Sequence, residues 1–122
     1  MSVTQTRRIQ LIAWNVRLKL EKERIYLGTH HGSPIKSTLN GLCDTASERI
    51  VSKAKHAGYE NIRTVKSLDG SHMFVLWTQA NGHKWLIDVT ATQFNNRRPK
   101  VCMLHVTSTT RLPYYWQLGD GS

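Results

Sequence analysis

The chain has 122 residues and a mass of 14.0 kDa, which is the size of a single domain. It carries 17 Lys and Arg against 8 Asp and Glu, so its net charge is +9 and its pI is near 10.0. No stretch reaches the roughly 18 consecutive apolar residues of a membrane helix, and two cysteines are too few for a disulfide scaffold or a zinc ribbon. A small basic domain remains, for which nucleic acid is the first partner to consider.

The basic charge is concentrated towards the two ends of the chain. Residues 1–42 carry a net charge of +5, residues 43–94 of +1 and residues 95–122 of +3. A nucleic-acid-binding module would combine the basic side chains of the two ends with aromatic residues near the C-terminus. These residues are Arg7, Arg8, Arg17, Lys19, Arg97, Arg98, Lys100, Tyr114, Tyr115 and Trp116. Because no helix-turn-helix, KH or RRM signature is present, we interpret the charge as a surface for an acidic partner or for solubility.

The N-terminal segment is predicted to be helical over residues 8–27. Its apolar residues recur at helical spacing, and they are Ile9, Ile12, Ala13, Val16 and Leu20. Alternation over residues 16–20 leaves a strand as the rival interpretation, although the Glu-Lys-Glu-Arg run favours a helix. Gly28 is expected to end the helix and a loop to span residues 29–40.

A second helix is predicted over residues 43–56, with Ala46, Ile50 and Ala54 on one apolar stripe and Gly58 as its stop. Acidic residues near its start and basic residues near its end suit the helix dipole. Strands are expected over residues 61–66 and 100–107, on either side of a hairpin.

The hairpin is the strongest local signal in the sequence. Residues 72–78 and 84–90 are rich in β-formers and flank an Asn-Gly pair at 81–82. A two-residue loop would place Asp88 on the opposite face from His72. A three-residue loop over 80–82 pairs Gln79 with His83, keeps the odd-numbered apolar residues on one face and makes His72 a diagonal neighbour of Asp88. We therefore predict the three-residue loop.

Three residues suggest nucleophilic catalysis. Cys43 lies at the first turn of a predicted helix, where the dipole favours the thiolate and free N–H groups face a developing oxyanion. A nucleophilic cysteine needs a base, usually His, and the base needs an orienting partner. Asp88 lies within a run that should be buried, so its carboxylate needs a partner, and the predicted register offers His72.

The other candidates favour structural interpretations. His83 is a rival base but is expected to be exposed at the loop, and Cys102 reads as a core strand residue. His30 and His31 are adjacent and lack the spacing of a metal site, so neither a metal nor a cofactor is expected. Tyr114, Tyr115 and Trp116 are expected to cap the core at least as readily as to stack on bases.

The order of these motifs resembles a known group of enzymes. Gly41-Leu42-Cys43 opens a helix, His72 opens a strand, and Asp88 lies in the segment LIDVTATQF at 86–94. This pattern is similar to papain-like and transglutaminase-like thiol enzymes, in particular the small papain-fold toxin and glutamine-deamidase effector domains of bacteria. The resemblance covers residues 40–94.

The resemblance implies an α+β fold with a papain-like core, in which the nucleophile helix packs on a small antiparallel sheet. Cys43 would be the nucleophile, His72 the general base and acid, and Asp88 the group that orients His72. Papain carries a Gln shortly before its Cys; here the nearest upstream amide is Asn40, which is the candidate second oxyanion donor. Thr90 and Gln93 are candidates to brace Asp88.

The expected function is thiol-dependent acyl transfer on an amide of a protein substrate. The pattern does not separate a glutamine deamidase from a cysteine peptidase, and a transglutaminase is the least favoured of the three. Alternatives are a nucleic-acid-binding module or an inactive papain-like domain that binds a protein. One domain is expected over 1–122, with a helical segment at 1–35, a catalytic core at 40–106 and a tail at 107–122. The N-terminus shows no cleavable signal peptide, so we expect a cytoplasmic protein or a delivered effector.

Overall fold

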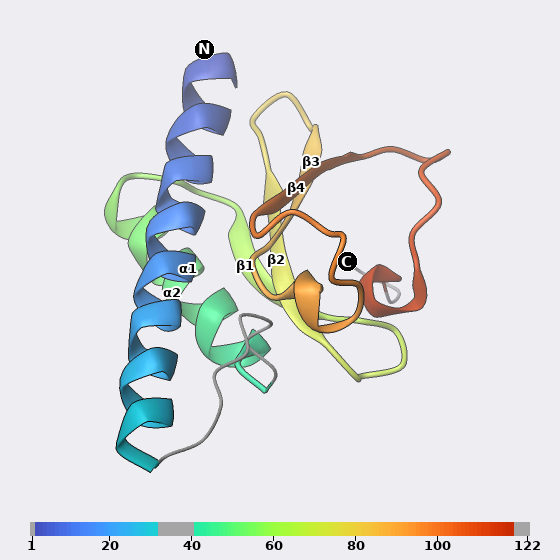
Figure 1. Cartoon of the computed structure of the whole chain (residues 1–122). Helices are drawn as coiled ribbons and strands as arrows, with labels where there is room; N and C mark the ends of the chain where they lie inside the picture. Colours follow the sequence, from blue (N-terminus) through green and yellow to red (C-terminus); the bar gives the residue numbers. More distant parts are fainter. Residues whose placement is uncertain (1, 32–40, 119–122) are drawn as a thin grey trace.

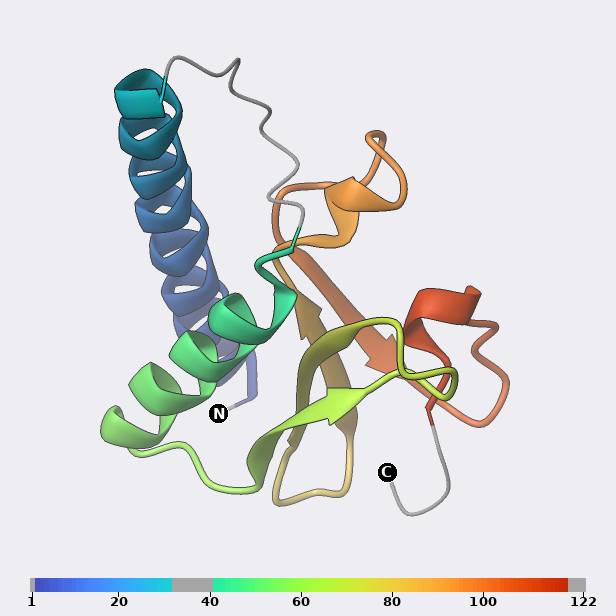
Figure 2. The same ribbon diagram turned by 90° about the horizontal axis from the view of Figure 1, so that it is seen from below.

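The computed structural model of the chain describes residues 2–31 and 41–118, with side-chain environments given for 4–23 and 41–118. Two helices lie against one face of an antiparallel sheet in the described part of the chain, and the C-terminal segment lies on the other face (Figure 1, Figure 2). The elements in chain order are α1 (Ser2–His31), α2 (Cys43–His56), β1 (Ile62–Lys66), β2 (Met73–Thr78), β3 (Lys84–Asp88), η1 (Ala91–Gln93), β4 (Cys102–Val106) and η2 (Tyr114–Trp116). The fold class is therefore α+β, as predicted.

The first helix is longer than predicted. The strand interpretation of residues 16–20 is wrong, because α1 runs without a break from Ser2 to His31. Gly28 does not end the helix: a single glycine costs only about 1 kcal/mol inside a helix, so it need not break one. The predicted loop falls on residues 29–40, of which 29–31 are helical and 32–40 lie outside the described residues.

The second helix begins and ends where the sequence predicts. Its buried face contains Ala46, Ile50 and Ala54 and also Ser47. Gly58 has a φ of 98°, in the left-handed region that glycine adopts without a steric penalty. The chain then turns back, and the Tyr59 N–H donates to the Ala54 carbonyl oxygen at 3.0 Å. This turn sends the chain into β1.

The sheet is an antiparallel meander in the order β1-β2-β3-β4. Val75 pairs with Ile87 and Leu76 with Leu86, which is the register of the predicted three-residue loop. The Gln79 N–H donates to the His83 carbonyl oxygen at 2.8 Å, and so closes that loop. In β2, β3 and β4 the register puts residues of even number on one face and residues of odd number on the other, whereas β1 pairs with the opposite parity, Ile62 with Trp77.

Both faces of the central hairpin are buried, because helices cover one face and the C-terminal segment covers the other. The odd-numbered residues Val75, Trp77 and Ile87 pack with the inner faces of α1 and α2. The even-numbered residues pack with the C-terminal segment. That segment is tied to the end of β1, because Leu118 pairs with Ser67 as an isolated bridge. The tail is thus part of the core structure that carries the candidate site.

One basic residue of the N-terminal segment is buried and does not contribute to a surface. Arg17 is 0% exposed. Its guanidinium donates to the Val89 carbonyl oxygen at 2.8 Å, to Thr92 Oγ1 at 3.0 Å and to Glu21 Oε2 at 3.0 Å. Interpreting the flanking charge as surface is therefore wrong for Arg17. The helix that precedes the core clamps the segment immediately after β3.

Replacing this arginine should destabilise the fold strongly. Arg17→Met should lower the free energy of unfolding by about 3 kcal/mol, because it leaves the buried Val89 carbonyl without its donor and removes the bonds to Thr92 and Glu21. Lys19→Met, at an exposed position of the same helix, should change it by no more than about 0.5 kcal/mol. Urea unfolding of the two variants tests this, and equal effects would contradict the clamping role.

Among the described residues, no helix is both long enough and apolar enough to cross a membrane.

Candidate active site

A buried histidine–carboxylate pair joins the two strands of the hairpin. His72 Nε2 lies 2.7 Å from Asp88 Oδ2, and the two side chains are 0% and 2% exposed. His72 directly precedes β2 and Asp88 is the last residue of β3. The diagonal contact that the hairpin register predicts is therefore present. A pair this short and this buried fixes the orientation of the imidazole ring.

Asp88 accepts hydrogen bonds at both carboxylate oxygens. The Thr90 backbone N–H and hydroxyl donate to Oδ1 at 2.9 and 3.1 Å. The Trp116 indole N–H donates to Oδ2 at 2.7 Å. Backbone and indole N–H groups can only donate, so both oxygens act as acceptors, as those of an ionised carboxylate do. The remaining role for His72 Nε2 is that of a donor to Asp88.

The other ring nitrogen of His72 is left without a partner. Nδ1 is buried and forms no hydrogen bond with any described residue. If Nε2–H donates to Asp88, the neutral ring carries its lone pair on Nδ1. Phe94 and Tyr115 contact the ring edge-on, with centroids at 4.7 and 6.4 Å. The site thus presents one unpaired basic nitrogen in an aromatic setting, which is how a general base is arranged.

The backbone at His72 is fixed by the turn that joins β1 to β2. The His72 N–H donates to Ser67 Oγ at 3.1 Å and the Ser67 N–H donates to the His72 carbonyl oxygen at 2.8 Å. Asp69 accepts from Ser71 and Ser67, and these hydrogen bonds hold the pKa of its carboxyl below the usual value. The turn holds His72 at the start of its strand.

Cys43 is the first residue of α2 and is partly buried. Ser47 lies one turn further along the same helix face. Its hydroxyl donates to the carbonyl oxygen of Met73, the residue after His72, at 3.2 Å. The face of α2 that carries Cys43 therefore packs against the start of β2. No hydrogen bond joins the Cys43 thiol to His72 Nδ1 in this structure.

The start of α2 leaves N–H groups near Cys43 that a side chain does not cap. Leu42 is the N-cap residue and forms no side-chain cap. Within the first turn, the Asp44 carboxylate accepts from the Thr45 N–H at 2.9 Å. Uncapped N–H groups at a helix start can bind an oxyanion. Asn40, the candidate second donor, lies outside the described residues.

The remaining candidate residues are Thr90, Gln93, His83 and Cys102, and of these only Thr90 forms a hydrogen bond with Asp88. Thr90 supports Asp88 directly, whereas the Gln93 side-chain nitrogen is buried without a partner among the described residues and makes no bond to Asp88. His83 is exposed, as expected. Cys102 is buried in β4, where burial, together with the nearby Asp88 carboxylate, raises the pKa of its thiol to about 11. Cys102 is therefore poorly suited to be a nucleophile.

The basic residues of the two ends do not form one surface with the C-terminal aromatic residues. Arg17 is buried, and Lys100 Nζ forms an ion pair with Glu21 at 3.0 Å. Arg98 lies over the Trp116 ring at 4.5 Å from its centroid and donates to the Tyr115 hydroxyl at 2.9 Å. Tyr115 and Trp116 are themselves buried, as expected of caps on the core, whereas Tyr114 is 54% exposed, so that expectation is wrong for Tyr114. These contacts weaken the nucleic-acid interpretation.

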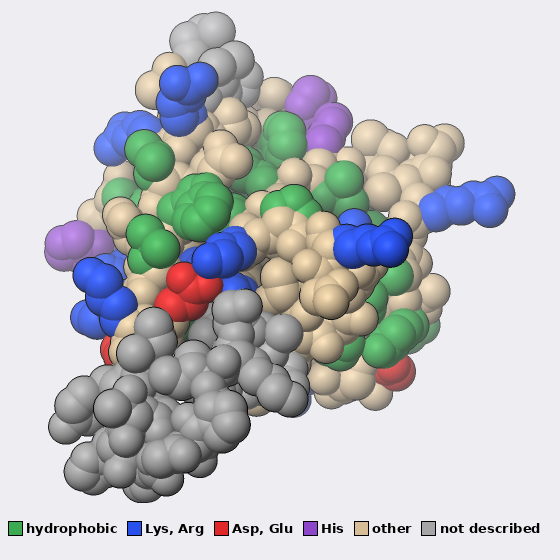
Figure 3. Space-filling model, viewed as in Figure 1, with side chains coloured by type: hydrophobic (Ala, Val, Ile, Leu, Met, Phe, Trp, Pro, Cys, Tyr) green, Lys and Arg blue, Asp and Glu red, His purple; other side chains and the backbone are tan. Residues whose placement is uncertain are grey.

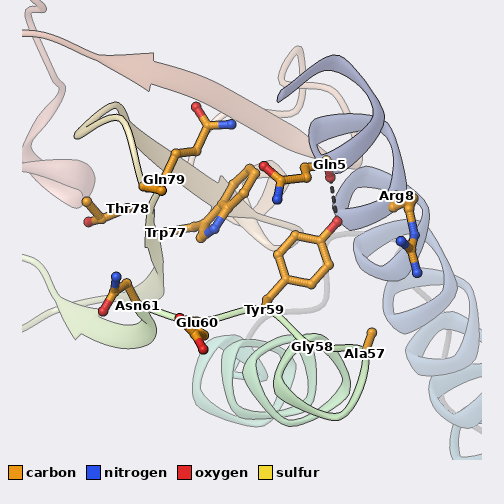
Figure 4. A pocket seen from close by; sticks show the side chains of 11 residues that line it. Gln5, Arg8, Ala57, Gly58, Tyr59, Glu60, Asn61, Trp77, Thr78 and Gln79 are labelled. Carbon is orange, nitrogen blue, oxygen red and sulfur yellow. Dashed lines mark hydrogen bonds between the residues drawn. The ribbon is translucent and has the colours of Figure 1, made fainter. Parts of the chain in front are cut away.

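A cavity of about 240 Å³ lies at the opposite end of α2 and β2 from His72. Figure 4 shows Tyr59 and Trp77 at its centre, with the Tyr59 hydroxyl donating to the backbone oxygen of Gln5. Gln79 lines it as well, and its side-chain oxygen accepts from the Trp85 indole at 2.9 Å. Cys43, His72 and Asp88 do not line this cavity, so it belongs to a separate part of the molecule.

Trp116 is the residue that sequence reasoning missed. The sequence predicts Trp116 as a cap on the core, and it is 2% exposed, but nothing in the sequence points to its bond with Asp88, 28 positions away. The expected burial of Asp88 indicates only that a further donor is needed, because its two carboxylate oxygens require more donors than His72 alone supplies.

Trp116→Phe should test this bond, because it keeps most of the aromatic packing and removes the indole N–H. If Asp88 orients a catalytic His72, we expect kcat to fall by about tenfold with little change in KM. This is the size of effect that the loss of one charge-assisted hydrogen bond produces. The control is Trp77→Phe, because Trp77 is buried on the other face of the sheet. This variant should lower stability without the effect on kcat. Equal kcat in the two variants would contradict the assignment.

Comparison with protein-family models, with curated proteins and with solved structures finds no match to this chain. Among the described residues there is also no group of three His, Cys, Asp or Glu side chains that could hold a metal ion.

Proposed function

We propose that this protein is a thiol-dependent acyl-transfer enzyme with Cys43 as nucleophile, His72 as general base and acid, and Asp88 as the residue that orients His72. The observation that carries the proposal is the buried His72–Asp88 pair at 2.7 Å with His72 Nδ1 left unpaired. A histidine that served only to pack would be expected to satisfy both ring nitrogens. The resemblance of residues 40–94 to papain-like and transglutaminase-like enzymes supports the same roles.

The reaction follows from the tautomer that Asp88 selects. Nδ1 takes the thiol proton of Cys43, and the thiolate sulfur attacks the carbonyl carbon of an amide. The tetrahedral oxyanion lies against the N–H groups at the start of α2. The C–N bond then breaks, the proton on Nδ1 passes to the leaving nitrogen, and an acyl thioester remains on Cys43. Water gives up a proton to Nδ1 and attacks the thioester, which releases the acid and restores the thiol.

The thiol and the imidazole are not hydrogen-bonded in the structure without substrate. This does not count against the proposal, because catalytic hydrogen bonds in free enzymes are often long and shorten only when substrate binds. Ser47, on the same helix face as Cys43, contacts the backbone of Met73, the residue after His72. The His72 ring itself packs with Phe94 and Tyr115 on the face of the sheet opposite the helices, so the proposed proton transfer requires the two side chains to approach each other when substrate binds.

The reaction products show which amide is cleaved and whether water or an amine accepts the acyl group. We expect the purified protein to release ammonia from glutamine side chains of an unfolded protein such as casein, which is the result for a deamidase. New N-termini in the same digest would identify a peptidase, and incorporation of a fluorescent amine a transglutaminase. Absence of all three products, with an unreactive Cys43, would overturn the proposal and favour an inactive domain that binds a protein.

A nucleic-acid-binding function remains the alternative from a different class. Its affinity would be dominated by phosphate contacts and would collapse as salt rises. Tight, sequence-selective binding that persists in Cys43→Ala would favour it over the enzyme. The burial or pairing of Arg17, Arg98 and Lys100 argues against it.

A further inference from the structure

Helix α1 has two apolar faces, and the fold uses only one of them. Its inner face carries Ile9, Ala13, Val16 and Leu20, which are buried against α2 and the sheet. A surface helix of a folded domain normally has one apolar stripe, which faces the core. The second stripe of α1 is therefore not explained by folding.

The second stripe consists of Leu11, Trp14 and Leu18, which follow helical spacing along one exposed line. They are 58%, 36% and 45% exposed. On the same line, four positions before Leu11 and four after Leu18, lie the exposed residues Arg7 and Lys22. We call these five residues the outer face of α1. Figure 3 shows hydrophobic side chains on α1 with Lys and Arg side chains around them.

The charge around this face is positive. Both described acidic residues of α1 are already paired: Glu21 with Arg17 and Lys100, and Glu23 with Arg49. The Lys100 and Arg17 contacts hold the pKa of the Glu21 carboxyl below its usual value even though burial acts to raise it. With Arg8 and Lys19 also exposed on α1, the apolar stripe is surrounded by uncompensated basic charge, within a chain of net charge +9.

We propose that the outer face of α1 docks onto an anionic lipid surface. A helix with Trp and Leu on one face and Lys and Arg around it matches the composition of helices that lie in the plane of a membrane interface. Tryptophan prefers the headgroup region, and basic residues are attracted by the negative surface potential of anionic lipids. A convex helix face suits a lipid surface, which needs no complementary groove.

Two other occupants fit the face less well. A second copy of this chain would bring together two surfaces of the same positive sign, and like charges repel. Three apolar side chains also fall well short of the roughly 800 Å² per partner that a stable protein interface buries. An acidic polypeptide would satisfy the charge but, on a convex face, would bury little of Trp14.

Vesicle sedimentation tests the proposal directly. The purified chain is mixed with vesicles of phosphatidylcholine alone or of phosphatidylcholine with about one third phosphatidylglycerol. We expect at least a tenfold stronger partitioning into the anionic vesicles, weakened as salt screens the charges. The intrinsic tryptophan fluorescence of the chain should shift to shorter wavelength on binding, and Trp14→Phe should abolish that shift because the other three tryptophans lie away from the outer face.

Matched variants separate the outer face from overall charge and hydrophobicity. Leu11→Ser with Leu18→Ser should lower anionic-vesicle partitioning by at least about tenfold, whereas Leu68→Ser, at a leucine that is 66% exposed elsewhere, should not. Arg7→Glu with Lys22→Glu should have a similar effect to the leucine pair. Arg63→Glu with Lys66→Glu on β1 changes the net charge equally and should leave most of the binding.

Four outcomes would overturn the proposal. The first is no partitioning into the anionic vesicles, and the second is equal partitioning into both vesicle types. The third is equal loss in the outer-face variants and their controls. Binding of polyglutamate through the outer face without vesicle binding would also overturn it, and would identify an acidic polypeptide as the occupant. Cys43 alkylation measured in the same preparations reports the proposed catalytic site separately.

Discussion

Cys43→Ala should abolish turnover while leaving the fold intact. We expect kcat/KM on an amide substrate to fall by about 10⁴-fold or more, since no covalent thioester can form without the sulfur. Alanine is the best helix former and Cys43 is only partly buried at the start of α2. The free energy of unfolding should therefore change by no more than about 0.5 kcal/mol. Amide turnover and urea unfolding on one preparation measure both quantities.

Cys102→Ala is the control for the loss of a thiol. Cys102 is buried in β4 and opposes Asp88 in the sheet register, so its truncation should lower stability by about 1–2 kcal/mol. It should keep activity within several-fold. An active Cys43→Ala variant would show that Cys43 is not the nucleophile. A folded but inactive Cys102→Ala variant would likewise contradict the assignment of the nucleophile to Cys43.

Asp88→Asn should lower kcat by about 10²–10⁴-fold with a smaller effect on stability. Asn has one acceptor oxygen and one amide group that donates. If the oxygen stays with the Thr90 N–H, the amide faces His72 Nε2 and the Trp116 indole, so His72 must accept there and carry its proton on Nδ1. In that tautomer Nδ1 cannot take the thiol proton.

Asp88→Ala separates this tautomer effect from simple loss of structure. It leaves the buried donors of Thr90, Trp116 and His72 unpaired, so the free energy of unfolding should fall by about 3 kcal/mol. A folded Asp88→Asn variant with wild-type kcat, measured beside the Ala variant, would mean that the His72–Asp88 pair serves the fold alone.

The local rules of the sequence predict the hairpin and the contact across it. The Asn-Gly pair, the parity of the apolar residues and the isolated carboxylate at Asp88 all select one register, and that register is observed. The same reasoning places Cys43 at a helix start, because Ala46, Ile50 and Ala54 form a single stripe. The catalytic role of these residues stays a prediction.

Contacts between segments far apart in the chain could not be predicted from the sequence. Nothing local shows that Trp116 reaches Asp88 or that Arg17 reaches Val89, because those contacts depend on how the two ends of the chain fold back onto the sheet. Helical periodicity also assigned a basic residue such as Arg17 to the surface by default, since an unpaired buried charge is costly. Its burial is possible only because a carbonyl, a hydroxyl and Glu21 accept from it.

The most direct test of the proposed site is the alkylation rate of each cysteine by iodoacetamide near neutral pH, followed by mass spectrometry. We expect Cys43 to react at least about 10²-fold faster than Cys102, whose thiol pKa of about 11 keeps it protonated. The Cys43 rate should fall by about tenfold or more in His72→Ala and in folded Asp88→Asn. Equal rates for the two cysteines, or a Cys43 rate that is unchanged in both variants, would contradict a catalytic Cys43–His72–Asp88 site.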